Sequence, residues 1–282
     1  MPAADQRSPD RAGIKLAERE FHDQIYSRSL VEHFPSTPTE FKEIFRRVHL
    51  TRFCDGGWSY WGDARAEAFR LLGNVSGKKL LDFGCGAGHA GVYLALEGAG
   101  VWGFDFAAAG VERAQQLAQH FGLGKRAQFE CMDAEALTYP ENFFDIVLGI
   151  GVLHHVIKYP GVAENTARIL KPGGRALFVE TLWDNPLINL ARRFSSLEKE
   201  AGDAPLTHLS IKQFARPFSG LVLRPRHLLY MLKRIAKLPA LELQTPLRPR
   251  PVWKAVLGLD RALLAFPPLR FFCGEVIVEL RK

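Results

Sequence analysis

The sequence is poor in cysteine, and its few cysteines are not spaced as ligands. Only four occur among 282 residues: Cys54, Cys85, Cys131 and Cys273. No CxxC pair or Cys/His ligand spacing is present, which argues against a zinc ribbon and against a disulfide framework. We therefore predict no metal site, and we expect a protein of a reducing compartment, the cytoplasm.

The sequence also lacks a long uninterrupted apolar run. The most apolar stretch, Val252–Phe272, contains four charged residues and two prolines, which excludes a bilayer-spanning helix there. The first residues, Met1–Arg19, are polar and charged and lack the apolar centre of a signal peptide. With 47% hydrophobic and 24% charged residues, the composition is that of a folded globular protein rather than a disordered one.

The net charge of +7 is unevenly distributed. Residues 190–282 hold 17 Lys and Arg against 7 Asp and Glu, whereas the first 189 residues are slightly acidic. A basic half is typical of proteins that meet anions, such as nucleic acid, phospholipid head groups at a membrane, or a phosphorylated substrate. A solvated basic surface explains the same charge, and both interpretations stay open.

Short apolar runs alternate with helical patterns from Lys79 onward. Five strands are predicted, at residues 79–83, 100–104, 127–131, 144–149 and 175–180. This alternation is typical of βαβ units, and it predicts a doubly wound α/β fold with a mostly parallel sheet. We divide the chain into a flexible lead (1–20), an N-terminal helical cap (21–72), a cofactor-binding core (73–182), and a C-terminal part (183–282) with a substrate-binding insertion or lid and the final strands.

A glycine-rich loop follows the first predicted strand. It reads Gly84-Cys-Gly-Ala-Gly88 and opens a helix at His89. Glycines permit a tight turn and close approach of a ligand to the backbone. Because Gly86-x-Gly88-x-x-Gly91 also fits the dinucleotide pattern, the loop alone leaves an NAD-dependent oxidoreductase open.

Carboxylates stand at the ends of the first three predicted strands, at Asp82, Asp105 and Asp133. The carboxyl ends of parallel strands meet at one edge of a sheet, where such folds bind ligands. Asp82 would repel a pyrophosphate but suits a cationic amine. Acids after the second and third strands can accept from ribose hydroxyls and from an adenine amino group. The trio therefore predicts a ligand with an amine at one end and an adenosine at the other.

These motifs resemble those of class I S-adenosylmethionine-dependent methyltransferases of the domain 11/25 type, over about residues 65–182. The stretches that carry the resemblance are Leu80–Gly88, Val101–Asp105, Met132–Ala134, Asn142–Val147, Leu153–His155 and Leu170–Gly174. The family implies a Rossmann-like sheet of seven strands and S-adenosyl-L-methionine as cofactor. The segment Asp184–Leu190 further resembles a bacterial small-molecule subgroup, although Asp184 stands where that subgroup often has His.

The resemblance also implies which residues hold the cofactor. Those around its methionine part are Asp82, Gly84, Cys85, Gly86 and Gly88, and those around its adenosine are Asp105, Phe106, Asp133, Ala134 and Ile150. Methyl transfer to an oxygen needs a base near the acceptor proton. His154, His155 and Glu180 are the catalytic candidates because they follow the fourth and fifth strands, and His208 is a weaker one. Packing or capping roles are the alternative for each.

The acceptor is expected to be a small molecule of natural-product, lipid, isoprenoid or glycolipid type. Nucleic acid is a weaker alternative, because Gly149–Val152 stands where enzymes that methylate base nitrogens carry an Asn/Asp-Pro-Pro-aromatic motif. A non-catalytic cofactor-binding partner protein also stays open. The aromatics Trp58, Tyr60 and Trp61 are candidates for cation–π contact with the sulfonium, or for ordinary packing. The sequence predicts no particular oligomeric state.

Overall fold

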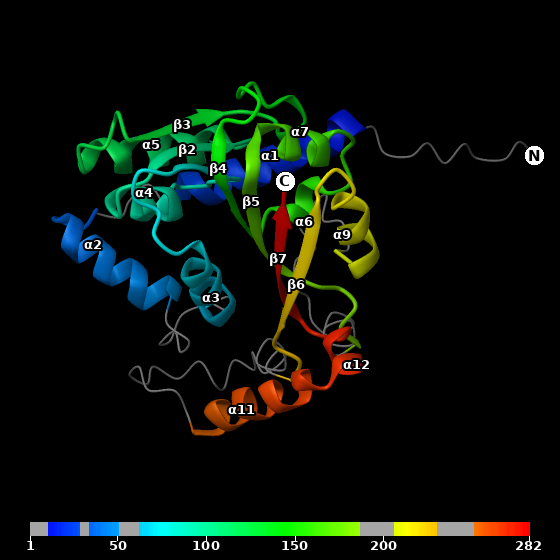
Figure 1. The fold of residues 1–282 in the computed structure, drawn as a ribbon. Coiled ribbons are helices and arrows are strands. Elements are labelled where there is room, and N and C mark those ends of the chain that lie inside the picture. Colours follow the sequence, from blue (N-terminus) through cyan, green and yellow to red (C-terminus); the bar gives the residue numbers. More distant parts are fainter. Residues whose placement is uncertain (1–10, 29–33, 51–61, 187–205, 230–250) are drawn as a thin grey trace, which may run out of the picture.

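A seven-stranded sheet with helices on both faces forms the centre of the computed structural model, which describes residues 11–28, 34–50, 62–186, 206–229 and 251–282 (Figure 1). The strand order is β3-β2-β1-β4-β5-β7-β6. β7 runs antiparallel to both of its neighbours, and the other pairings are parallel. This confirms the predicted doubly wound, mostly parallel α/β fold.

The strands begin and end close to the predicted positions. Their bounds are β1 Lys79–Phe83, β2 Gly100–Asp105, β3 Ala127–Cys131, β4 Phe144–Ile150, β5 Leu170–Thr181, β6 Gly220–Arg226 and β7 Glu275–Arg281. β5 begins five residues before the predicted start. Lys171–Gly174 are part of this strand, and its pairing with β4 shifts between Phe144 and Ile146.

The helices lie before, between and after the strands. Their bounds are α1 Arg11–Arg28, α2 Pro38–Phe45, η2 Arg46–Leu50, α3 Gly62–Leu72, α4 His89–Leu96, α5 Ala108–His120, η3 Ala134–Ala136, α6 Leu153–Val156, α7 Val162–Ile169, α9 His208–Phe214, α11 Pro251–Ala265 and α12 Pro267–Arg270. The last part of the expected cap is therefore helical, and α9, α11 and α12 lie in the C-terminal part. The domain boundaries stay predictions.

Each face of the sheet has its own hydrophobic core, because successive side chains of a strand point to opposite faces. In β1, Leu80 belongs to the core that also holds residues of α2, α3, α4 and α5, whereas Leu81 belongs to the core that holds residues of α6, α7 and α9. Both leucines are fully buried. Strands covered on both faces read as continuous apolar runs, which is the pattern the sequence shows.

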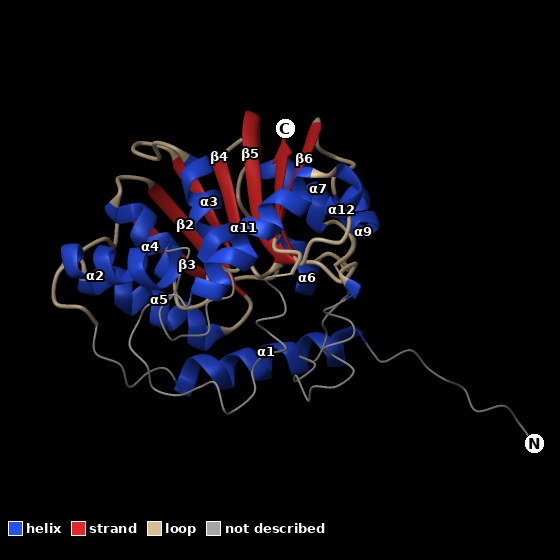
Figure 2. Ribbon diagram, turned by 90° about the horizontal axis from the view of Figure 1, so that it is seen from below, coloured by secondary structure: helices blue, strands red, loops and turns tan. Residues whose placement is uncertain are grey.

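The flexible lead expected over residues 1–20 stays a prediction: residues 11–20 belong to the helix α1, and residues 1–10 lie outside the described part. Figure 2 shows α1 as a long helix outside the sheet, next to α5. Its polar side chains meet charged groups of the loops that follow the strands, as in the ion pair between Glu18 and Lys158. A helix held by charges lacks the apolar stripe that would have revealed it.

No helix within the described residues is both long and apolar enough to cross a membrane.

Candidate functional site

The glycine loop adopts a backbone that other residues rarely take. Its three glycines all have positive φ angles, of 68°, 49° and 75°: Gly84, Gly86 and Gly88. A Cβ atom on Gly86 would lie 2.5 Å from the hydroxyl oxygen of Tyr26 in α1. Both conformation and space therefore require glycine, and the loop gives close access to the backbone at the carboxyl end of β1.

Asp105, at the end of β2, braces this loop. Its carboxylate accepts hydrogen bonds from the backbone N–H of Gly86 at 2.8 Å and of Ala107 at 2.9 Å. Burial raises the pKa of the Asp105 carboxyl, and these hydrogen bonds oppose the rise. The side chain thus ties the glycine loop to the start of α5 and remains on the wall of the cavity described below.

Asp82, in β1, lies deeper in the protein than Asp105 and does not line the cavity described below. Its side chain is 3% exposed and accepts a hydrogen bond from the backbone N–H of Gly91 at 2.9 Å. Burial, with a smaller contribution from the negative charge of Asp105, raises the pKa of Asp82 to about 7. An acid in this state is about half protonated near neutrality, and an approaching cation would favour its ionised form.

A cavity of about 140 Å³ lies at the carboxyl ends of β1, β2, β3 and β4. Six of the predicted cofactor residues line it: Gly84, Asp105, Phe106, Asp133, Ala134 and Ile150. The other four, Asp82, Cys85, Gly86 and Gly88, are absent from its lining, so they support the wall rather than form it. Cys85 is buried, which raises its thiol pKa.

One face of α1 closes this cavity, which was not predicted from the sequence. The lining residues of α1 are Lys15, Glu18, Arg19, His22 and Tyr26. They recur every three or four positions, which is the spacing of one helix face. The Arg19 guanidinium lies 5.6 Å from the ring centre of Phe106, and the His22 ring packs edge-on against His155 with centroids 5.2 Å apart. Only this spacing of polar residues could have indicated a lining helix.

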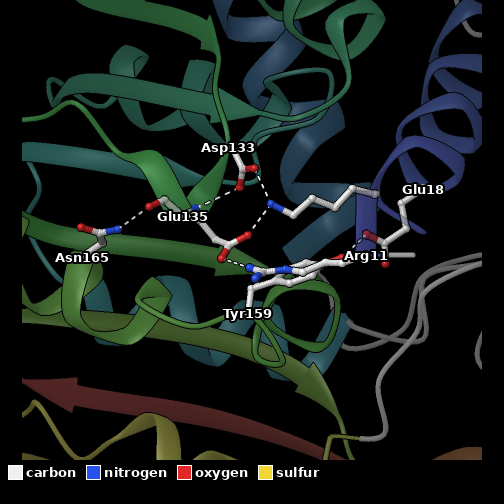
Figure 3. A network of polar contacts seen from close by, with 7 residues as sticks. Arg11, Glu18, Asp133, Glu135, Tyr159 and Asn165 are labelled. Carbon is white, nitrogen blue, oxygen red and sulfur yellow. Dashed lines mark hydrogen bonds and ion pairs between the residues drawn. The ribbon is translucent and has the colours of Figure 1, made fainter. Parts of the chain in front are cut away.

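Charged contacts hold α1 over the cavity (Figure 3). Lys15 forms ion pairs with Asp133 and Glu135, and Arg11 pairs with Glu135. Farther along the helix, Glu18 binds Lys158 at 2.8 Å. The carboxylate expected to meet an adenine amino group is therefore bound by a lysine of α1.

Glu180 is fully buried at the end of β5. One carboxylate oxygen accepts from the backbone N–H groups of Val152 and Leu153 at 2.9 and 2.7 Å. The other lies 2.8 Å from Nδ1 of His154. The carboxylate therefore caps α6 and orients an imidazole, and it does not line the cavity.

The two histidines of α6 differ in position. His155 lines the cavity, and His154 does not. Burial, followed by repulsion from His154, lowers the pKa of His155 to about 2, so His155 is neutral at physiological pH. His154 is paired with a buried carboxylate, an arrangement that fixes the orientation and the tautomer of its imidazole.

The remaining candidates lie away from the cavity or outside the described residues. His208 Nδ1 lies 2.7 Å from Asp184, and its ring stacks on Phe271. The loop aromatics Trp58, Tyr60 and Trp61 fall outside the described residues. In the described part of the chain, no group of three or more His, Cys, Asp or Glu side chains is placed to hold a metal ion.

Residues 81–178 match a family model described as a methyltransferase domain. A sterol 24-C-methyltransferase of Gibberella zeae is 30% identical over 209 residues, covering 71% of this chain and 52% of that protein. A 27-O-demethylrifamycin SV methyltransferase of Amycolatopsis mediterranei is 37% identical over 128 residues, covering 41% and 47%. The chain thus spans about half the length of these relatives.

Solved structures share the fold at low identity. A geranyl diphosphate methyltransferase in complex with GPP and sinefungin aligns with a TM-score of 0.58 and 14% identity, covering 95% of this chain and 99% of that one. The cyclase SpnF aligns with a TM-score of 0.55 and 20% identity, covering 89% and 99%. With the glycine loop, the three acids and the match over residues 81–178, the chain belongs to the class I S-adenosylmethionine-dependent methyltransferases.

Proposed function

We propose that this protein transfers a methyl group from S-adenosyl-L-methionine to a small-molecule acceptor. The observation that carries the proposal is the cavity at the carboxyl edge of the sheet, where Asp105 and Asp133 stand beside the glycine loop. Acids after neighbouring strands suit the ribose hydroxyls and the adenine amino group. The buried acid Asp82, behind the loop, suits a nearby cation, because a positive charge would favour its ionised form.

The cofactor fits this cavity only if α1 moves. The cavity of about 140 Å³ is smaller than the roughly 300–1,000 Å³ typical of ligand pockets. Lys15 of α1 also binds Asp133. We therefore infer that α1 shifts outward as the cofactor enters and that Lys15 releases Asp133 for adenine.

The bound cofactor would supply a methyl group on a positively charged sulfur. The sulfur becomes neutral when the methyl group is transferred, so its departure needs no acid. The chain's own task is then to hold the acceptor in line, which can lower a barrier by about 7–11 kcal/mol, and to exclude water. The face of α1 and the Ile150 end of β4 enclose the cavity for this purpose.

For an acceptor that must lose a proton, His154 is the better base of the two histidines. His155 holds a proton too weakly, with a pKa of about 2. His154 is oriented by Glu180, which makes Glu180 a positioning residue and not a group that touches the acceptor. His154 does not line the cavity as it stands, so an acceptor would reach it only after α1 opens.

The acceptor class follows from the relatives and remains part of the proposal. The matched methyltransferases are named for a sterol and a rifamycin, and Coxiella burnetii relatives are named for ubiquinone biosynthesis. We infer a bulky, largely apolar acceptor of natural-product, lipid or isoprenoid type. A cytoplasmic location is part of the same proposal.

A second candidate is a protein that binds the cofactor without transferring methyl. It is favoured by one observation, the similarity to a cyclase of the same fold, because a fold by itself does not fix the chemistry. Methyl transfer to nucleic acid stays a weaker prediction, resting on the basic C-terminal half alone.

The test combines binding and turnover. Calorimetry with S-adenosylhomocysteine should detect binding to the wild-type chain and a loss of at least about tenfold in affinity for Asp105→Ala, since each ribose hydrogen bond to a charged acid contributes about 1.5–3 kcal/mol. Incubation with labelled cofactor and host extract should then yield a product heavier by one methylene. Binding without any such product would support the non-catalytic alternative, and absence of binding by folded protein would refute both.

A further inference from the structure

A second cavity, of about 570 Å³, lies between β6, α3 and α11. It is at the edge of the sheet opposite to β3. It shares no lining residue with the cofactor cavity. β6 is the outermost strand at its end of the sheet, and Figure 1 shows α11 and α3 near the lower part of this strand. The cavity is therefore a separate feature of the C-terminal half.

Arginines dominate the charged lining. Five line the cavity, against two carboxylates: Arg70, Arg224, Arg226, Arg261 and Arg270 against Glu67 and Asp260. They come from α3, β6, α11 and α12, so four separate elements bring positive charge to one place. The excess of basic residues noted in the sequence of the C-terminal half is thus concentrated in part at this cavity.

The neighbouring carboxylates do not neutralise these arginines, because arginines share them. Glu67 accepts from Arg70 at 2.6 Å and pairs with Arg226 at 3.4 Å. Glu279, next to the cavity, pairs with Arg224 at 2.8 Å and with Arg281 at 2.9 Å. Two carboxylates thus serve four guanidinium groups, and positive charge remains.

The second carboxylate of the lining, Asp260, is occupied by the backbone. It is 2% exposed and accepts hydrogen bonds from the N–H groups of Leu228 and Leu229 at 3.1 and 2.6 Å. These bonds attach α11 to the loop after β6 and fix one wall of the cavity. Asp260 therefore acts mainly as a structural clamp, while Arg261 beside it is exposed.

Arg224 has further capacity to bind an anion. Its side chain is 34% exposed, and its terminal nitrogen meets Glu279. Within the described residues, its buried Nε atom has no hydrogen-bond partner. Side chains at alternate positions of a strand share a face, so Arg224 and Arg226 both lie on the face of β6 that Glu67 of α3 contacts.

The same cavity is also partly apolar. Aliphatic side chains complete its lining: Val222, Leu223, Leu257, Leu264 and Ala265. Leu259 and Phe266, on or next to α11, are 50% and 60% exposed. A ligand that fits both properties carries an anionic group and an apolar chain.

We propose that this cavity binds a phosphate or diphosphate group attached to an apolar chain, with Arg224, Arg226 and Arg261 as its anion-binding residues. Guanidinium groups bind phosphate oxygens through paired N–H donors, and their geometry favours phosphate over a point-like anion. The aliphatic wall receives the first part of the chain. The phosphate belongs either to a soluble ligand or to a lipid head group at a membrane surface.

The test uses the full chain without cofactor, so its outcome is independent of methyl transfer. Octyl phosphate and inorganic pyrophosphate serve as soluble probes in calorimetry, and phosphatidylglycerol and phosphatidylcholine vesicles serve in co-sedimentation. The double variant Arg226→Gln/Arg261→Gln removes two charges from the cavity. Arg126→Gln is the matched control, because Arg126 is exposed just before β3, at the opposite edge of the sheet.

We expect the wild type to bind octyl phosphate more tightly than pyrophosphate, and the double variant to bind at least about tenfold more weakly. Arg126→Gln should bind like the wild type, and affinity should fall with salt. If phosphatidylglycerol vesicles bind the protein more strongly than its affinity for octyl phosphate explains, the phosphate group belongs to a lipid. If they do not, the phosphate group belongs to a soluble ligand. The proposal is overturned if wild-type protein binds neither probe nor vesicle, or if the control loses as much affinity as the double variant. Arg261→Gln alone, at an exposed position, repeats the test should the double variant not fold.

Discussion

Replacing the buried acid Asp82 by asparagine should stabilise the protein, and more so as the pH rises. Asp82 has a folded-state pKa of about 7 against an ordinary value of 3.8. The unfolded chain therefore ionises this carboxyl first, and the folded state loses stability as the pH rises from about 4 to about 7. Linkage gives a cost of about 1.5 kcal/mol near pH 5 and about 4 kcal/mol near pH 8.

Asp82→Asn keeps an oxygen that can accept from the Gly91 N–H and cannot ionise. Urea unfolding of both proteins should show a stability difference that grows by about 2–3 kcal/mol between about pH 5 and about pH 8 in favour of the variant. A difference that stays constant with pH would refute the argument from burial.

Asp145 provides a control of opposite sign. Burial by itself would raise the pKa of Asp145, but the hydrogen bonds from Lys171 and from the Lys79 N–H lower that pKa below its ordinary value. Its stabilisation is present above the ordinary carboxyl pKa and is lost as the pH falls through the lowered value. Asp145→Asn should therefore destabilise the protein at neutral pH, with a difference that shrinks in acid.

Three further outcomes are expected from single substitutions. Lys15→Met removes the partly buried ion pairs to Asp133 and Glu135 and should speed S-adenosylhomocysteine association about two- to fivefold in stopped-flow fluorescence, for a loss of about 0.2–1 kcal/mol; an unchanged rate would contradict the opening of α1. Gly88→Ala places a Cβ 2.5 Å from that of Ala114 at a φ of 75°, and should lower the free energy of unfolding by about 2–4 kcal/mol; a urea midpoint equal to that of the wild type would show that the loop relaxes freely. Glu180→Gln leaves one oxygen for three donors and should cost about 1–3 kcal/mol of stability and lower kcat for an acceptor that must lose a proton; loss of stability with an unchanged kcat would limit Glu180 to capping α6.

The core of the site could be predicted because its residues are local to strand ends. Gly84 and Asp105 follow apolar runs that can only be buried strands, and parallel strands bring their carboxyl ends together. The hydrogen bond from the Gly86 N–H to Asp105, which braces the glycine loop, follows from the same meeting of strand ends.

The parts that escaped prediction depend on contacts between distant segments. α1 is polar because it docks onto Asp133, Glu135 and Lys158, more than a hundred residues later in the chain. Its sequence therefore resembles that of an unstructured lead. The role of Glu180 also depends on a distant segment. A carboxylate at a strand end can face a ligand or cap a neighbouring helix. The position at which α6 begins decides between the two, and no local sequence pattern specifies that position.

The position of β7 has a consequence for synthesis of the chain. β7 lies between β5 and β6, although the ribosome makes it after both. Until it emerges, the nascent protein carries two unpaired strand borders, each able to recruit another polypeptide. Pairing of β7 with both strands closes these borders, so we expect the newly made chain to be most prone to misassociation before β7 is available.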